Sequence, residues 1–400
     1  MQKQYKEDLE EFINLTKWSR GTLVDSKYPN EDWHLNFYQS HSLEELKKFI
    51  DSLQLDEKIL DDYTFNYYMN VLIKYMSEHL DSHTHLAFYK VTPLPYKLKW
   101  INGSGLFIDY SLDAKIRKAK VLKINGILVE KLIDEYEKCV SYATYNHLYA
   151  MIENNFNILE VLYSLPSFKR DNLLLKVETD KGILSIDTKN SLKECLLERK
   201  DTKPNFYIQD KALIFTYQSC HPYYIPVIDS LLKVLDRETK NQNITKFVLD
   251  LRGNGGGASV IIKPLIEYLK NANLELVTIV DKGVFSSGRF ACVAMQMIGS
   301  KVVGEQIGTP INCFGNVLRP PVLTNTTQQP IFAKTYWYLD DEKEKMVGIN
   351  EKKELLNHDN DFFKPKFLKL DEEYTETLND FINDYDIFLK NALANHTKIK

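Results

Sequence analysis

Hydrophobic residues in the first part of the chain recur at a spacing that predicts helices. In Lys6–Trp18, Leu43–Leu53 and Tyr63–His79 they return every three or four residues, as on one face of an amphipathic helix. Strand-like alternation begins near His83, where the last of these segments ends. We therefore expect an N-terminal helical region over residues 1–92 that carries the His83 segment.

The pattern then changes to short runs that are typical of strands. Gly103–Tyr110 and Lys118–Gly126 predict two strands, and the Asn-Gly pair that ends the second is a strong turn signal. Val129–Val140 has helical spacing, and 171–188 predicts a hairpin that turns at its Asp-Lys-Gly. These elements predict a separate β-rich module over residues 93–200.

From residue 201 to 400 strands and helices alternate. The apolar run FVLDL ends in a glycine-rich turn, and Ala258–Lys270 follows with its apolar residues near helical period. The plan repeats at once: the strand Leu274–Asp281, a loop with two serines, and a helix from about Arg289. Two adjacent strand–loop–helix units predict an α/β region, within a chain that is α+β as a whole. Open α/β sheets place their functional sites at such strand ends.

Composition and charge narrow the function classes. Hydrophobic residues make up 44% of the 400 and aromatic residues 12%, enough for two or three domains with large cores. The net charge of −4, without a basic patch, gives no case for nucleic-acid binding. No run of about 18 apolar residues predicts a membrane span. The N-terminus lacks a secretory signal, so we expect a cytoplasmic protein. The five cysteines form no CxxC pair, which argues against a disulfide framework.

The two loops together provide groups that acyl transfer needs. The glycine-rich turn Gly253–Gly257 offers flexible backbone N–H groups, and Ser286 and Ser287 offer hydroxyls at a helix start. A nucleophile beside preorganised donors for an oxyanion is the requirement of such enzymes. One serine could instead simply cap the helix, and both uses are compatible if Ser287 caps while Ser286 reacts.

The glycine turn has two other interpretations. It matches G-x-G-x-x-A, the dinucleotide fingerprint, which would make the protein a nucleotide-binding oxidoreductase. However, Asp250 and Arg252 interrupt the apolar strand, and Glu275 stands near the start of the next strand instead of its end. The turn could also be a tight bend that needs glycine and carries no chemistry.

His83 and His85 are candidates for a base or for a metal site. Residues two apart on a strand share a face, and a His-x-His pair can bind zinc. No third ligand with metal-site spacing follows, so we expect neither a metal nor another cofactor. One of the two could serve as general base for a serine, or both could be structural. Spacing alone cannot bring a residue about 200 positions away to Ser286.

Several segments together match a family. LDLRGNGGG, FSSGRFA and VVGEQIG followed by FGNV, in this order, resemble the C-terminal processing, or tail-specific, serine peptidases and their tricorn-like relatives. DSHTHL, WINGSGLFI and VLKINGILVEKLI resemble the upstream histidine segment and PDZ-like module of that family, and AKTYWY resembles clostridial-type members. The resemblance implies a crotonase/ClpP-like catalytic core over residues 201–400 and a PDZ-like peptide-docking module over residues 93–200.

The resemblance also implies residue roles. Ser286 matches the nucleophile, and the N–H groups of Ser287 and of Gly255 or Gly256 would form the oxyanion hole, braced by Asn254 and Arg252. Many members use a lysine as base, but its position falls on Pro310 or its neighbours Thr309 and Ile311. Tricorn-like members use a histidine after a serine, which here assigns His83 as base and Ser82 as its orienting neighbour. The carboxylate of such members would be one of four residues: Asp340, Asp341, Glu342 or Glu344.

These observations predict a serine endopeptidase that cleaves polypeptides held through an extended C-terminal segment. Arg289 stands where the family has an acidic residue, and the lysine is missing. A degenerate peptide-binding pseudo-peptidase is therefore the first alternative, and the dinucleotide-binding oxidoreductase is the second. The sequence predicts no oligomeric state.

Overall fold

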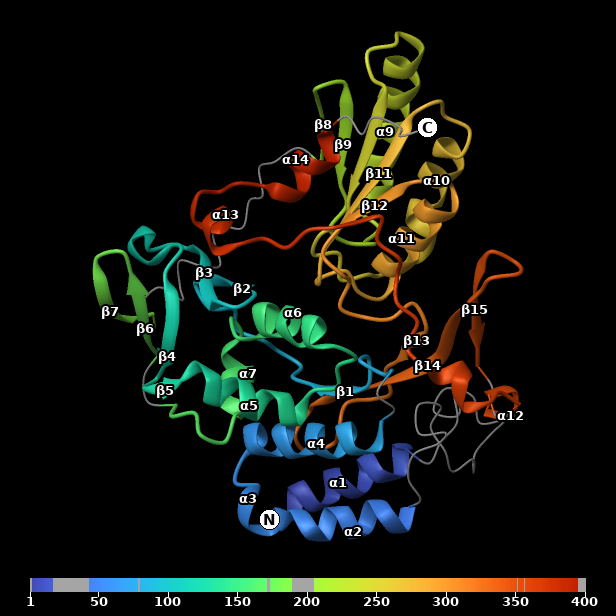
Figure 1. The fold of residues 1–400 in the computed structure, drawn as a ribbon. Helices are drawn as coiled ribbons and strands as arrows, with labels where there is room; N and C mark the ends of the chain where they lie inside the picture. Colours follow the sequence, from blue (N-terminus) through green and yellow to red (C-terminus); the bar gives the residue numbers. More distant parts are fainter. Residues whose placement is uncertain are drawn as a thin grey trace.

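A six-stranded sheet forms the centre of the C-terminal half of the chain. We describe a computed structural model, which covers residues 2–16, 43–77, 80–170, 173–188, 205–350, 352–355 and 357–394. The strand order is β16-β12-β11-β10-β9-β8, parallel except for β8, which runs antiparallel to β9 (Figure 1). The bounds are β8 Phe206–Gln209, β9 Ala212–Thr216, β10 Lys246–Asp250, β11 Glu275–Val280, β12 Lys301–Gly304 and β16 Glu372–Glu373.

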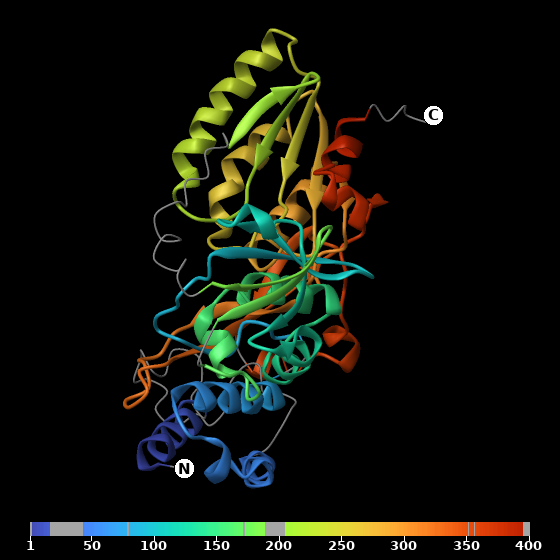
Figure 2. The ribbon, with the colours of Figure 1, turned by 90° about the vertical axis from the view of Figure 1, so that its left-hand side faces the viewer.

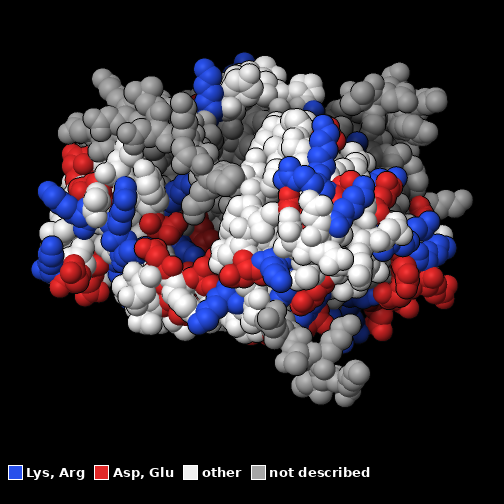
Figure 3. Space-filling model, turned by 90° about the horizontal axis from the view of Figure 1, so that it is seen from above, with Lys and Arg blue, Asp and Glu red and all other residues white. Residues whose placement is uncertain are grey.

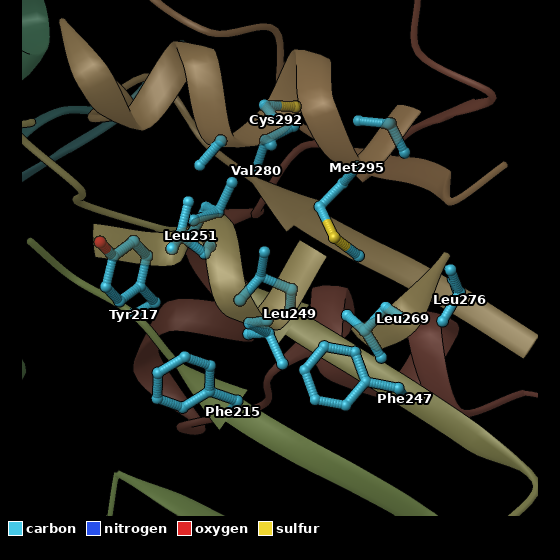
Figure 4. Close-up of a cluster of buried hydrophobic side chains, with 14 of the residues drawn as sticks. Phe215, Tyr217, Phe247, Leu249, Leu251, Leu269, Leu276, Val280, Cys292 and Met295 are labelled. Carbon is cyan, nitrogen blue, oxygen red and sulfur yellow. The ribbon is translucent and has the colours of Figure 1, made fainter. Parts of the chain in front are cut away.

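Helices cover both faces of this sheet. On one face α9 (Tyr224–Lys240), α10 (Lys263–Leu269) and α11 (Ser287–Met297) pack over Phe215, Phe247 and Leu249 (Figure 4). On the other face α14 (Ile387–Leu393) packs with Phe388 against the alternate strand residues. Strands buried on both faces need a continuous apolar run, which explains why FVLDL does not alternate. The sheet therefore holds the carboxyl ends of β10 and β11 side by side.

The β-rich module is a second, largely antiparallel sheet in the order β2-β3-β4-β6-β7, with β5 paired to β4. Asn125 and Gly126 both have positive φ, 48° and 78°, as the predicted two-residue turn requires. The predicted hairpin and helix are confirmed. The bounds are β2 Tyr96–Ile101, β3 Gly105–Ser111, η2 Ala114–Ile116, β4 Lys120–Ile124, β5 Ile127–Leu128, α5 Val129–Cys139, α6 Tyr145–Asn155, α7 Leu159–Ser164, β6 Leu174–Thr179 and β7 Gly182–Asp187.

The N-terminal helices lie at the opposite end of the molecule from the tip of the central sheet (Figures 1 and 2). They are α1 Lys3–Thr16, α2 Leu43–Leu53, α3 Leu55–Lys58 and α4 Asp62–Met76, so the three predicted helices are confirmed within the described residues. The predicted ends at Trp18 and His79 lie outside those residues. A reciprocal cap between Asp61 and Thr64, which we did not predict, starts α4.

A third sheet joins one strand of the N-terminal region to three strands of the C-terminal half. The strand β1 (His85–Ala87) pairs antiparallel with β14 (Gln329–Asp340), which also pairs with β13 (Cys313–Leu318) and β15 (Lys345–Ile349). The segment that carries His83 is therefore fixed to residues more than 200 positions later. The remaining elements are η4 Ser259–Ile262, α12 Lys352–Leu355, η5 Asn360–Phe363 and α13 Leu378–Ile382.

A buried ion cluster connects the β-rich module to the loop after β11. Lys282 Nζ lies 3.0 Å from Glu153 Oε1 on α6 and 3.7 Å from Glu305 Oε2, and it donates to the Trp100 carbonyl at 3.2 Å. Burial opposes the charge, but the two carboxylates outweigh it and raise the pKa of Lys282 well above its usual range. The serine loop is thus held between the core and the module.

Two helices of the central region begin at other residues than we expected. The helix expected from about Arg289 begins at Ser287, and Ala258–Lys270 begins as the 3₁₀ turn η4 before α10, so our helix starts were wrong by a few residues.

No helix in the described ranges is long and apolar enough to cross a membrane. The four described cysteines are buried and free. Lys/Arg and Asp/Glu side chains are interspersed on the face shown in Figure 3.

Candidate active site

The glycine loop and the serine loop are in direct contact at the carboxyl ends of β10 and β11. A methyl group on Gly256 would lie 2.6 Å from Ser286 Cβ and 2.8 Å from the Ser287 nitrogen. A methyl group on Gly288 would lie 2.6 Å from the Asn254 carbonyl oxygen. Both glycines are therefore required for the approach of the loops. The absent side chain of Gly256 makes room for Ser286.

Asn254 holds the two loops together. Its side chain is fully buried, accepts the Gly256 N–H at 2.9 Å through Oδ1 and donates to the Tyr217 carbonyl at 2.6 Å. Its own carbonyl accepts the N–H of Phe285 at 2.9 Å. One amide residue therefore fixes the position of the residue before Ser286. This arrangement agrees with the bracing role expected for Asn254.

Ser286 has a strained backbone at the start of α11. Its φ of 51° and ψ of −121° lie outside the regions that residues with a side chain usually adopt. Such conformations cost about 1–3 kcal/mol and cluster at functional sites. The Ser286 side chain makes no capping bond, whereas Ser287 Oγ donates to the Gly257 carbonyl at 2.6 Å. The two serines thus differ: the hydroxyl of Ser287 is engaged, and that of Ser286 faces the cleft described next.

A cleft of about 620 Å³ opens at these two loops. Ser286, His83 and Ser82 all line it, so the structure brings the predicted nucleophile, base and orienting serine to one cavity. The second histidine candidate, His85, lines it as well. The other walls combine apolar and aromatic side chains with polar ones and two arginines: Val260, Phe285, Phe290, Val317, Ile331, Trp337, Ser259, Ser287, Asn316, Arg289 and Arg319.

Two backbone N–H groups are available beside Ser286. Gly255 lines the cleft, and its N–H has no acceptor among the described residues. The N–H of Ser287 belongs to the first turn of α11, where no intrahelical acceptor exists. The N–H of Gly256 is already donated to Asn254, and Gly256 does not line the cleft. Of the two glycine N–H groups, that of Gly255 is therefore the one open to the cleft.

His83 lies between α4 and β1, with its backbone fixed and its ring free of hydrogen bonds. The carboxylate of Asp81 accepts the N–H groups of His83 at 2.8 Å and Thr84 at 2.9 Å. The ring stacks on Phe285 with centroids 4.4 Å apart. Neither ring nitrogen has a hydrogen-bond partner in the described part of the chain, although the side chain is only 8% exposed. No hydrogen bond joins His83 to Ser286 in this arrangement.

The surroundings of His83 keep its ring neutral. Burial lowers the pKa of His83 to about 3, and the positive charge of Arg289 contributes to the shift. His147, on α6, also stacks on Phe285, at 5.1 Å, and burial lowers its pKa to about 4. Phe285 thus contacts histidines from both the N-terminal region and the β-rich module. A neutral imidazole can accept a proton from a hydroxyl.

The four acidic candidates lie away from the cleft, and Pro310 or one of its neighbours occupies the position of the family's lysine. Asp340 pairs with Lys343 and Asp341 with Lys366 at the turn between β14 and β15, which also holds the two glutamates. None of the four carboxylates lines the cleft. The Pro310 carbonyl accepts a hydrogen bond from Arg289 at 3.1 Å. Arg252 pairs with Asp250 and with Asp386 at the start of α14, which ties the glycine loop to the core.

Sequence reasoning missed His147, Arg319 and part of the role of Trp337. No local motif marks His147, because its position depends on α6 packing against Phe285. Trp337 belongs to a segment that we matched to the family, but its place in the cleft follows from the pairing of β13 with β14. Among the described residues, no group of three or more histidines, cysteines or carboxylates could hold a metal ion.

Solved structures share this fold. The chain is similar to mature CPAF complexed with lactacystin, with 10% identity, a TM-score of 0.62 and 97% of each chain covered. It is similar to mature CPAF itself, with 9% identity, a TM-score of 0.58, and 97% and 96% of the two chains covered. A photosystem II D1 C-terminal processing protease matches with 10% identity, 94% of each chain covered and a TM-score of 0.43. No family model and no curated protein matches the sequence. The chain therefore has the fold of CPAF along nearly its whole length.

Proposed function

We propose that this protein is a serine peptidase of the tail-specific type. One observation carries the proposal: a strained serine, at a helix start against a glycine loop, shares a cleft with a buried neutral histidine. The chain shares the fold of CPAF, but a fold does not set a function, so the proposal rests on the site. The segments that resemble the C-terminal processing family also carry these residues.

In the proposed reaction Ser286 Oγ attacks the carbonyl carbon of a peptide bond while His83 accepts the hydroxyl proton. The N–H groups of Ser287 and Gly255 donate to the oxyanion of the tetrahedral intermediate. As the intermediate collapses, His83 gives the proton to the leaving amine, and an acyl-enzyme forms on Ser286. Water, deprotonated by His83, then hydrolyses the ester. Catalytic hydrogen bonds that are open in a free enzyme often close in the substrate complex.

The finer features of the family belong to the same proposal. The catalytic core, 201–400, would be crotonase/ClpP-like, and the module 93–200 would be PDZ-like and dock an extended C-terminal segment by strand addition. The five-strand order with α5 packed against it supports a compact docking module. The helical region 1–92 would supply His83, the histidine base of tricorn-like members.

A fluorophosphonate probe tests the nucleophile. We expect the wild-type chain to be labelled, Ser286→Ala to lose labelling, and mass spectrometry to map the adduct to Ser286. Ser287→Ala is the matched control, because it removes the neighbouring hydroxyl and keeps the backbone N–H. Labelling that survives in Ser286→Ala, or an adduct on Ser287, would sink the assignment. Lactacystin, which CPAF binds, is a second probe for the same comparison.

The histidine pair tests the base. His83→Ala should reduce labelling by roughly 100-fold or more, as the loss of a general base does. His85 lines the same cleft, but its Nδ1 lies 2.9 Å from the His83 carbonyl, so it is the matched comparison and His85→Ala should change labelling far less. Equal losses in both variants would show that the base is misassigned.

A peptide-binding pseudo-peptidase is the second candidate, favoured by a specific observation. With a pKa of about 3, His83 is a weak base in the free protein, and no carboxylate lines the cleft. A chain that binds peptides in this cleft but is labelled by neither probe would be such a protein.

A further inference from the structure

The side chains with a permanent charge that line the cleft are all positive. Arg289 and Arg319 line it, and no aspartate or glutamate does. The chain as a whole has the opposite balance, with 55 acidic and 51 basic residues. A positive cleft in an acidic chain raises the local concentration of anionic ligands.

Arg289 forms no ion pair with a described residue, and both it and the buried carboxylate of Asp81 act on the Cys313 thiol. Its side chain is 1% exposed, and its neighbours are all neutral: the Pro310 carbonyl, the Cys313 thiol and the Phe290 ring, 4.8 Å from the guanidinium carbon. Its Nε has no hydrogen-bond partner, and no described carboxylate lies within ion-pair distance. A buried cation without a counter-ion is costly, and an anion beside it removes much of that cost.

Arg319 provides a second cation at the mouth of the same cleft. It follows the end of β13, is exposed and forms no ion pair with a described residue. The two guanidinium groups offer the planar donors that match a carboxylate. Apolar side chains stand on the other walls, so the cleft combines cations with surfaces for aliphatic or aromatic residues.

We propose that this cleft selects peptides that carry a carboxylate, which Arg289 and Arg319 bind while apolar neighbours of that residue contact Val260, Phe290 and Trp337. The proposal rests on the proposed function in so far as an extended peptide occupies the cleft. The carboxylate comes from an acidic side chain or from a free C-terminus, and the experiment below separates these sources.

Selection of this kind would also act on the base. The positive charge of Arg289 is one of the causes that hold down the pKa of His83. Burial is the larger cause and remains, but a carboxylate bound beside Arg289 offsets the second cause and so raises the pKa of His83. The substrate thereby supplies the negative charge that no residue of the cleft provides.

Binding to the full-length Ser286→Ala variant tests the proposal without hydrolysis. Four fluorescent peptides of one apolar sequence would be compared by anisotropy: central Glu or Gln, each with a free or an amidated C-terminus. We expect at least one carboxylate-bearing peptide to bind about tenfold more tightly than the Gln amide, which is about 1.4 kcal/mol. The Glu amide reports the side chain, and the Gln acid reports the terminus. Raising the salt concentration should weaken the part of the carboxylate preference that depends on the exposed Arg319.

Three variants in the Ser286→Ala background locate the effect. Arg319→Gln should reduce the preference at least threefold, and Arg289→Met with Arg319→Gln should abolish it. Methionine fills the buried site without a charge, and circular dichroism checks that the double variant folds. Arg237→Gln, which replaces an arginine with 65% of its side chain exposed on α9, is the matched control and should leave the preference unchanged.

Equal binding of all four peptides would overturn the proposal, as would a preference that Arg319→Gln does not reduce. These results are independent of catalysis. A wild-type chain that resists the fluorophosphonate probe but keeps the preference would refute the peptidase and leave the selection intact. Labelling without any preference would refute the selection alone.

Discussion

The two halves of the candidate site are held in different ways. The half from the core, the glycine and serine loops, is held by backbone hydrogen bonds through Asn254 and by contacts too close for any side chain at Gly256. The half from the N-terminal region has a fixed backbone at His83, but its ring is held by packing on Phe285 and against Gly315 of β13, without a hydrogen bond from either ring nitrogen.

This difference follows from where each half originates. The loops leave neighbouring parallel strands, so one sheet positions both, and oxyanion stabilisation requires such preorganised donors. His83 lies just before β1, which pairs with β14, and its ring packs on the Phe285 side chain and against Gly315. Substitutions in the glycine and serine loops should therefore lower both stability and reactivity. Substitutions around the His83 ring should lower reactivity more than stability.

The largest effect is expected at Gly256. Gly256→Ala places a methyl group 2.6 Å from Ser286 Cβ at a φ of 94°, so strain and overlap should lower the free energy of unfolding by about 3 kcal/mol or more. Urea denaturation measures the loss, and fluorophosphonate labelling should fall with it. Gly255→Ala is the matched control for stability, because a methyl group there meets nothing within 4 Å. Equal stability losses in both variants would show that the loops are not in tight contact.

The sequence predicted the first half of the site far better than the second. The strand, turn and helix around Gly256 are local, and the same pattern repeats at Ser286, so periodicity and glycine content predicted these elements. The choice of Ser286 over Ser287 came from the family resemblance. The pairing of β1 with β14 is not local, and only the family resemblance linked His83 to Ser286. The contact of His147 with Phe285 depends on how α6 meets the core, and no spacing rule describes it.

Helix starts and charge pairs show the same limit. The helix at Ser287 starts earlier than predicted because the strained Ser286 takes the cap position without a capping bond. The cluster of Lys282 with Glu153 and Glu305 joins three segments that are distant in sequence, so composition alone could not reveal it. Local patterns specified elements, and tertiary packing specified which elements meet.

An intermediate effect is expected at Phe285, where stability and reactivity should separate. Phe285→Leu keeps an apolar side chain but removes the flat ring on which His83 stacks, so labelling should fall about tenfold while stability falls by about 1 kcal/mol. Phe381→Leu is the matched control: it makes the same change in a buried residue that packs on Phe107 of the β-rich module. It should lose similar stability and keep its labelling.

One outcome would contradict the prediction for Phe285. If Phe285→Leu and Phe381→Leu change labelling equally, stacking does not position the histidine. The second half of the site would then be as rigid as the first, and the contrast between the two halves would disappear.

The smallest effect is a pH dependence of stability that belongs to the histidine half. The pKa of His83, about 3, lies below the usual 6.5 of an unfolded histidine, so the unfolded chain binds the extra proton. The contribution to stability is therefore complete above pH 6.5 and is lost as the pH falls toward 3. By pH 5.5 the loss should amount to about 1.4 kcal/mol. Arg289 and His147 both disfavour the proton, and Asp81 faces the backbone of His83.

Denaturation of the wild type and of His83→Leu between pH 7.5 and 5 measures this term. The wild type should lose about 2 kcal/mol more than the variant over that range, because leucine takes up no proton on unfolding. His147 contributes in the same direction in both proteins and cancels in the difference. His221→Gln, which replaces an exposed histidine before α9, is the control and should retain the wild-type slope. A variant with the same slope as the wild type would mean that the ring of His83 reaches solvent, and that the histidine half is open where the core half is closed.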